Sequence, residues 1–335
     1  MQITFIIPCY NAEDSIISCL DSINSNKELE AISKILCVDD ASTDNTGDVI
    51  IEYIETHPNV ALYSLEENGG PGVARNQGIR KVNTEYICFV DSDDLINPEV
   101  YLKMYHHICL HDEDYVGCNV ISFDGQEYFD VALNHMRMMN IPEKITDDLI
   151  TFYPTLLLGN LCMPYIYRRQ IFEDYDLWFI EGYYEDIIFT HNLHSTDLDF
   201  GFINERGYIY CASPNSITSK DYTYQNQLTK MMNYKLLIED LNDEEYIDMM
   251  LYQILVFETI ILLKNTETYK DFKTLIGWVK PWLTKTILNM LPPLYHGLYQ
   301  CIAYDDEELY ETFKRCLKYG QYLKFNTGMG IEGEE

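Results

Sequence analysis

Positive charge is scarce in this chain. Among its 335 residues, 54 are acidic and only 23 are Lys or Arg, which gives a formal net charge of −31 at pH 7. Extended binding to a nucleic-acid backbone depends on Lys and Arg displacing counterions, so this balance argues against a nucleic-acid partner. The same negative field would repel an anionic nucleotide unless a metal ion or a local basic group offsets it. A metal site is therefore physically attractive.

Long apolar runs and targeting signals are also missing. The longest apolar run covers residues 251–263, is interrupted by Gln253 and Glu258, and is too short to span a bilayer. The first residues, MQITFIIPCYN, have no basic region, and their apolar run is too short for a signal peptide. We therefore expect a cytoplasmic protein without a transmembrane segment, for which a peripheral position at the inner face of the membrane stays open.

Disulfide and zinc motifs are absent as well. None of the ten cysteines forms a C-x-x-C pair, and most lie inside apolar runs such as ILCVDD, which predicts buried, reduced thiols. His191 and His194 are three residues apart on a predicted helix, but no cysteine or carboxylate stands at ligand spacing beside them. We expect these histidines to be packed or solvated rather than zinc ligands.

The first hundred residues alternate between strand and helix patterns. Short β-prone apolar runs cover residues 3–7, 35–38, 60–65 and 86–90. Asn11 is a candidate N-cap for the first helix, and a Gly-rich turn leads into a later helix that begins near Val73. This alternation predicts an α/β fold with a doubly wound sheet. The chain is also long enough for a second region beside that core.

Carboxylates follow two of these predicted strands. Asp39 and Asp40 come after the second strand, and the run Asp91-Ser92-Asp93-Asp94 comes after the fourth. In an open α/β sheet ligands bind at the carboxyl ends of the strands, so both acidic ends should face one crevice. Asp-Ser-Asp offers two hard oxygen ligands suited to Mg²⁺ or Mn²⁺. The simpler alternative is a polar turn after a buried strand.

The remainder of the chain is less regular and then helical. A helix to about Cys109, a strand over residues 115–123, a helix over 147–158 and a new element at 165–171 are predicted. Amphipathic helices follow over residues 224–241, 244–263, 272–288 and 307–323. These helices predict an appendage over residues 219–327, followed by a Gly- and Glu-rich tail, residues 328–335, that we expect to be disordered.

Glu185 and Asp186 open a predicted helix after a turn at Gly182. Two alternatives stand for this pair: ordinary acidity at a helix N-terminus, or a general base. The aromatic and apolar residues around the pair predict that at least one of the two carboxylates is partly buried.

Six motifs in order carry a resemblance to a known family. They are FIIPCYNAEDSIISCLDSI, CVDDASTDNT, NGGPGVARNQGI, YICFVDSDD, GYYEDIIF and PNSIT, and they span roughly residues 3–218. Together they resemble the family 2 glycosyltransferases, the inverting nucleotide-sugar transferases of GT-A fold. The resemblance implies a GT-A domain with a mixed sheet over residues 1–218. It also implies a sugar donor that is a nucleoside diphosphate, commonly UDP, and a glycan, glycolipid or other hydroxyl acceptor, as in polysaccharide biosynthesis.

The resemblance also implies a role for each matching residue. The first loop, with Pro8, Tyr10 and Asn11, would wrap the nucleotide, and Asp40 would read the base. Gly70, Arg75 and Asn76 would form a boundary of the donor pocket. In the D-x-D element, Asp91 and Ser92 would lie near the ribose, and Asp93, with Asp91, would hold the Mn²⁺ or Mg²⁺ that bridges the diphosphate. In the E-D pair, Asp186 would be the general base, with Glu185 beside it.

Two departures from the family pattern stand out. Tyr165 stands where a lysine is usual, and Cys211 stands where an arginine is usual. Both replacements remove positive charge, which leaves open a degenerate domain that binds a nucleotide sugar or a partner protein without turnover. The helical appendage could orient an acceptor, form a homo-oligomer or lie against a membrane.

Two other enzyme classes are weaker alternatives. A dinucleotide-binding oxidoreductase would need G-x-G-x-x-G after the first strand, but this chain has Gly70 and Gly72 after the third strand, with Arg75 in place of the last glycine. A phosphatase using Asp91 as nucleophile would need a D-x-D-x-T pattern, which fails at Leu95.

Overall fold

The computed structural model divides the chain into two compact units, Met1–Ser219 and Lys220–Glu335, each considered by itself below. It describes residues 2–123, 128–130, 161–182, 184–211, 223–240, 247, 250, 251, 254–259, 262, 263, 266–283 and 293–318. The predicted helix over 147–158, the PNSIT motif and the tail over 328–335 lie outside these residues.

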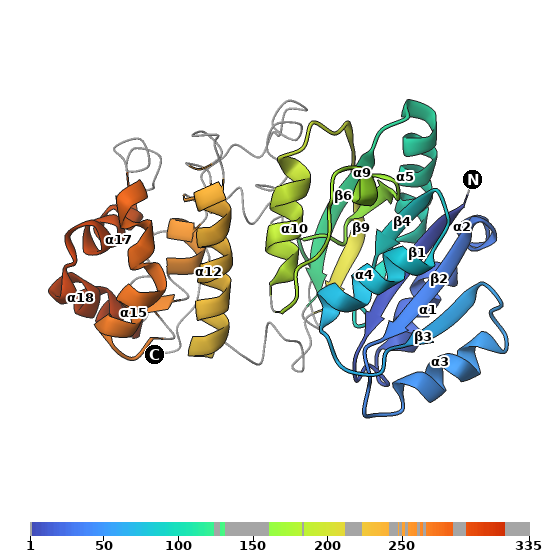
Figure 1. Ribbon diagram of the computed structural model, residues 1–335, viewed down its shortest axis with the longest axis horizontal. Helices are drawn as coiled ribbons and strands as arrows, with labels where there is room; N and C mark the ends of the chain where they lie inside the picture. The colour runs from blue at the N-terminus through green and yellow to red at the C-terminus, as the bar shows by residue number, and fades with distance from the viewer. Residues whose placement is uncertain are drawn as a thin grey trace. The chain divides into compact units, whose positions relative to one another are not determined.

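A mixed sheet forms the centre of the first unit (Figure 1). Its parallel half is built from β1 (Ile3–Cys9), β2 (Ser33–Asp39), β3 (Val60–Ser64) and β4 (Tyr86–Phe89), in the order β3-β2-β1-β4. All seven residues of β1 are buried, as expected for a parallel strand covered on both faces. The four strands predicted in this part of the sequence are confirmed.

The second half of the sheet makes it mixed. The strands are β5 (Leu95–Ile96), β6 (Tyr115–Phe123), β7 (Tyr128–Asp130), β8 (Tyr165–Arg168) and β9 (Phe200–Cys211). Strand β8 lies antiparallel between β4 and β6, and β9 runs parallel to β6. The pairing of β6 and β9 is irregular near Asn119, where β9 carries extra residues. Strand β9 was not predicted from the sequence.

Helices cover the sheet on both faces. They are α1 (Ile16–Asn24), α2 (Lys27–Ile32), α3 (Thr46–Ile54), α4 (Pro71–Lys81), α5 (Pro98–His111), α9 (Ile171–Asp174) and α10 (Glu185–His194). Helix α1 contacts α2, α3 and α5, whereas α4 contacts α10 (Figure 1). The direction of the connections reverses between β1 and β4. In open α/β sheets, ligands bind at the carboxyl ends of the strands beside such a switch point.

The N-terminus of α1 differs from the prediction. The helix begins at Ile16 with Ser15 at the N-cap position, so the expectation that Asn11 caps it is wrong. Asn11 has a positive φ of 50° and uses its side chain in the loop after β2 instead. An Asn tolerates this left-handed conformation, whereas a helix N-cap is typically extended.

The core of the first unit is rich in thiols and rings. Of the nine cysteines whose side chains the structure describes, seven are buried, which confirms the prediction of buried free thiols. Phe179 and Phe189 stack with ring centroids 4.2 Å apart, and both pack edge-on against Phe89 of β4. This aromatic cluster ties the start of α10 to the strand that carries the D-x-D element.

The second unit is helical where it is described. It contains α12 (Tyr224–Asp240), the π-helical turn η1 (Ile254–Glu258), α15 (Tyr269–Ile276), the 3₁₀-helix η2 (Gly277–Trp282), α17 (Pro293–Tyr304) and α18 (Glu307–Lys318). Most of the helix predicted over 244–263 lies outside the described residues. Across the residues that can be described, the structure has no helix long and apolar enough to cross a membrane.

The prediction of one helix over residues 272–288 is wrong. The α-helix ends at Ile276, a tighter 3₁₀-helix follows through Pro281, and Leu283 is extended. Pro281 lacks the N–H that an α-helix would need at this point, and its ring opposes the preceding turn. Pro293 is the first residue of α17, a position where its missing N–H does no harm.

Candidate active site

The loop after β1 meets the loop after β2 at the carboxyl edge of the sheet. Pro8 is buried at the end of β1, whereas Tyr10 is 49% exposed. The Asn11 Oδ1 atom accepts hydrogen bonds from the Thr43 N–H, at 2.8 Å, and from the Thr43 hydroxyl, at 3.2 Å. These bonds hold the predicted nucleotide loop beside the acidic end of β2.

Asp40 is buried and organises the glycine turn. Its Oδ1 atom accepts the Gly69 N–H at 2.8 Å, and its Oδ2 atom accepts the Gly70 N–H at 2.7 Å. Gly70 has a φ of 86°, a conformation that residues with a side chain rarely adopt. The structure therefore brings Asp40 and Gly70 into direct contact, in front of helix α4.

The D-x-D element forms a tight turn directly after β4. The Asp94 N–H donates to the Asp91 carbonyl at 3.0 Å, and Asp91, Ser92 and Asp93 are all half-buried. Burial and the neighbouring Asp91 carboxylate raise the pKa of Asp93 to about 6. A carboxyl group in this environment gains from a nearby cation.

The donor set of this turn fits a divalent cation. Mg²⁺ is commonly bound through one or two carboxylates, with substrate phosphates and water completing its shell. Asp91 and Asp93 supply such carboxylates, and no group of three His, Cys, Asp or Glu side chains suited to a metal occurs within the described ranges. A site completed by phosphate oxygens needs no third protein ligand.

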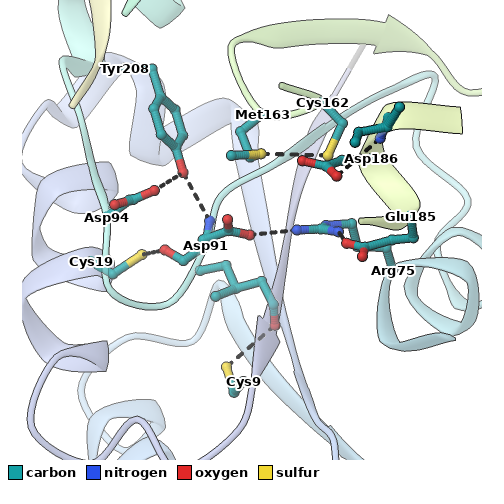
Figure 2. Close-up of polar contacts among 12 residues, drawn as sticks. Cys9, Cys19, Arg75, Asp91, Asp94, Cys162, Met163, Glu185, Asp186 and Tyr208 are labelled. Atoms are coloured by element: carbon teal, nitrogen blue, oxygen red, sulfur yellow. Dashed lines mark hydrogen bonds and ion pairs between the residues drawn. The ribbon is translucent and has the colours of Figure 1, made fainter. Parts of the chain in front are cut away.

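Arg75 of α4 lies between two carboxylates (Figure 2). Its Nη2 atom is 2.8 Å from Asp91 Oδ1, and its Nη1 atom donates to Glu185 Oε1. Burial lowers the pKa of Arg75, but the neighbouring carboxylates of Asp91 and Glu185 raise it by more, so the guanidinium stays charged. The structure thus connects the D-x-D element to the E-D pair.

The E-D pair opens helix α10. Glu185 is buried against Arg75, whereas Asp186 is half-buried and its Oδ1 atom accepts the Ile187 N–H at 3.0 Å. The expectation that at least one of these carboxylates is partly buried is confirmed. Gly182, with a φ of 103°, and Tyr184, with a φ of 62°, turn the chain into the helix.

Helix α4 holds the segment before α10 by two further contacts. The Asn76 amide donates to the Phe179 carbonyl at 2.8 Å and accepts the Phe179 N–H at 3.1 Å. A Cβ atom on Gly72 would lie 2.6 Å from the Ile180 carbonyl oxygen, so only glycine permits this approach. Asn76 is buried and contacts the polypeptide backbone, a role that the motif alone did not indicate.

Tyr208 and Asp94 are two site residues to which the sequence assigned no role. The Tyr208 hydroxyl donates to Asp94 Oδ2 at 2.5 Å and accepts the Asp91 N–H at 3.2 Å (Figure 2). For Asp94 the sequence did contain a signal, because it is the third carboxylate of the DSDD run and stands next to the apolar residues Leu95 and Ile96. Tyr208 gave no such signal, because strand β9 itself was not predicted.

The two departures from the family pattern lie in different places. Tyr165 is fully buried, and its ring packs against Tyr115 and Phe200 in the core. Cys211 is half-buried, and burial followed by the charges of Asp94 and Asp93 raises the pKa of its thiol to about 11. A neutral thiol therefore stands close to the D-x-D turn.

His191 has the character of a packed histidine. It is buried in α10, and burial lowers its pKa to about 4, so the ring is neutral at pH 7. The side chain of His194 is outside the described set.

The family of the chain follows from its sequence. The model of Glycosyl transferase family 2 matches residues 4–176, more than half of the chain. The chain belongs to this family. A poly(ribitol-phosphate) beta-glucosyltransferase of Bacillus spizizenii is 43% identical over 224 residues, which are 62% of this chain and 33% of that protein. This family 2 chain spans between about a third and just under two thirds of the length of the curated relatives that it matches first.

Solved structures show the same fold. The crystal structure of S. aureus TarS 1–349 in complex with UDP-GlcNAc matches with a TM-score of 0.73 at 20% identity, over 96% of this chain and 92% of that one. A mannosyltransferase from Pyrobaculum calidifontis in complex with GDP-Man and Mn²⁺ matches with a TM-score of 0.57 at 14% identity, over 99% and 88% of the two chains. The predictions of membership in family 2 of the glycosyltransferases and of a GT-A fold are confirmed, and the oxidoreductase and phosphatase alternatives fall.

Proposed function

We propose that this family 2 chain is an inverting glycosyltransferase that moves a sugar from a UDP-sugar to a hydroxyl group of a glycan acceptor. The observation that carries the proposal is the Arg75 ion pair with both Asp91 and Glu185. It joins the element expected to bind the donor to the helix that begins with the candidate base. The two chemical functions of a transferase therefore meet in one place.

The donor is proposed to lie along the carboxyl edge of β1, β2 and β4. Exposed Tyr10 and the loop of Asn11 would flank the nucleotide, and Asp40 would face the base. The TarS structure named above contains UDP-GlcNAc, which supports a UDP-sugar for this chain. Gly70 shapes this edge because its N–H orients the Asp40 carboxylate.

Asp93 and Asp91 are the residues that would hold a divalent ion, Mn²⁺ or Mg²⁺. When bound there, such an ion supplies positive charge that stabilises the leaving diphosphate. The Mn²⁺ in the mannosyltransferase structure supports this assignment. Ser92, between the two carboxylates, is half-buried and close to where the ribose would lie.

Asp186 is the proposed general base. Its carboxylate takes up the proton of the acceptor hydroxyl as that oxygen attacks the anomeric carbon from the face opposite the diphosphate. The bond between the anomeric carbon and the diphosphate oxygen breaks, UDP leaves, and the sugar configuration inverts. Asp186 lies in the first turn of α10, where the helix N-terminus carries partial positive charge. Glu185 is buried and paired with Arg75, so it would instead orient the start of the helix.

We further propose that residues 1–218 form the catalytic domain, which is followed by the helical region, residues 219–327. The named relative from Bacillus spizizenii acts on poly(ribitol phosphate), which makes that polymer the first acceptor to test.

Release of UDP from a panel of UDP-sugars, with Mn²⁺ and with EDTA, tests this proposal. We expect Asp186→Asn to lower turnover by about 10²–10⁴-fold while UDP affinity is retained. Asp48→Asn is the matched control, because Asp48 is an exposed carboxylate in the first turn of another helix, α3. Equal turnover in Asp186→Asn and wild type would remove Asp186 as the base. Nucleotide binding without turnover across all acceptors would favour the degenerate domain.

A further inference from the structure

The D-x-D turn is held from two sides by buried groups. On one side, the Cys19 thiol of α1 donates to the Asp91 carbonyl at 3.5 Å. On the other side, strand β9 contributes the Tyr208 hydroxyl and the Cys211 N–H, which donates to Asp94 Oδ1 at 2.8 Å. Cys19, Tyr208 and Asp94 are each 1% exposed or less, and the Tyr208–Asp94 bond is buried, so water does not compete for that bond.

Tyr208 is the central group of this arrangement. One hydroxyl oxygen donates to Asp94 and accepts from the Asp91 backbone, so it spans both ends of the turn. Asp93 lies between those ends. Its place relative to Asp91 is thus set by bonds that Asp93 itself does not make.

The irregular pairing of β9 explains why Tyr208 reaches the turn. Cys118 pairs with Ile203, but Val120, two residues later, pairs with Tyr208. The extra residues in β9 shift the register by an odd number, which exchanges the faces to which later side chains point. Strand β5 then pairs Ile96 with Tyr208, directly beyond the turn.

Repulsion among the carboxyl groups of the D-x-D turn is a second reason why the turn requires stabilising contacts. Asp91, Asp93 and Asp94 bring three carboxyl groups together in four residues, and like charges at this spacing repel. The Tyr208 O–H and the Cys211 N–H both donate to Asp94. These donors offset the repulsion at Asp94 and leave Asp93 available for a ligand.

We propose that Tyr208 and Asp94 are positioning residues, which hold Asp91 and Asp93 in the geometry that binds the metal–diphosphate part of the donor. The inference rests on the proposed function, since it concerns the same donor site. It assigns strand β9 a task in donor binding, in addition to its place in the sheet.

Tyr208→Phe tests the inference, because it removes only the bridging oxygen. We expect the UDP affinity measured by calorimetry with Mn²⁺ to fall about tenfold, because the loosened turn must be ordered again when the donor binds. The UDP affinity measured with EDTA should stay unchanged. The matched control is Tyr310→Phe in the other compact unit, where the buried hydroxyl also has two partners, Thr266 and Lys314. That variant should keep the wild-type affinity under both conditions.

Each outcome has a distinct meaning. Wild-type protein that binds no UDP in the presence of Mn²⁺ would overturn the proposed function. If wild type binds and Tyr208→Phe keeps the full Mn²⁺-dependent affinity, or loses equal affinity with EDTA, the positioning role is wrong. If Tyr208→Phe does not fold, Cys19→Ala loosens the same turn from the side of α1, and the same selective loss with Mn²⁺ is expected.

Discussion

The guanidinium of Arg75 donates to Asp91 at 2.8 Å and to Glu185 through its second terminal nitrogen. One buried cation therefore compensates a carboxylate of the D-x-D turn and a carboxylate at the start of α10. In the proposed function, donor binding by Asp91 and the placement of Asp186 both depend on this ion pair. Any change at Arg75 should affect both.

Replacing Arg75 by Met should strongly destabilise the first unit. The change leaves Glu185 buried without its partner, which typically costs about 3–5 kcal/mol. Urea unfolding measures the loss. Arg80→Met is the control on the same helix, because Arg80 is exposed and only lies over the Trp178 ring, so we expect a change of about 1 kcal/mol or less. Equal losses in the two variants would contradict the importance of the ion pair.

Gly72→Ala should displace the segment before α10. The new Cβ would lie 2.6 Å from the Ile180 carbonyl oxygen and 2.9 Å from Glu185 Cγ. We expect a loss of about 1–3 kcal/mol in the free energy of unfolding, together with lower turnover. Gly47→Ala, in the first turn of α3, meets only Asp39 Oδ2 at 3.7 Å and should be neutral or slightly stabilising. A neutral Gly72→Ala would show that α10 moves freely relative to α4.

Asp93→Asn should abolish stabilisation by Mn²⁺ with UDP. Ligand that binds only the folded state raises its stability with the logarithm of saturation, so a thermal shift reports the loss. Asp14→Asn removes the same charge from an exposed position and should keep the wild-type shift. A full shift in Asp93→Asn would remove Asp93 from the metal site.

His191 should make the first unit less stable in mild acid. Its pKa is lowered to about 4 in the folded state, from the usual 6.5, so the unfolded chain binds more protons between these values. The free energy of unfolding is therefore not reduced by His191 above pH 6.5, and it falls as the pH decreases towards 4. From pH 7 to pH 5 we expect a loss of about 2 kcal/mol from this group. His191→Gln should show a smaller difference in unfolding free energy between those two pH values. An unchanged difference would mean that other groups cause the acid sensitivity.

The first half of the fold was predictable because its signals are local. Strands β1 to β4 are short, continuous apolar runs, and each is followed by a turn rich in Gly, Asn or Asp. Strand β9 escaped prediction because Asn204, Glu205 and Arg206 interrupt its apolar pattern at the place where its pairing with β6 shifts. The helix over 272–288 was overestimated because apolar spacing continues through Pro281, where the backbone cannot stay α-helical.

The sequence by itself determined the family, the α/β class and the acidic ends of β2 and β4. These depend on residue type and on spacing along the chain. Only the tertiary structure decided what Arg75, Asn76 and Tyr208 contact. Their partners Glu185, Phe179 and Asp94 are far from them in sequence, and pairing at such distances depends on how the sheet and the helices pack. Local pattern cannot encode that packing, because each contact exists only after the elements on both sides have formed and met.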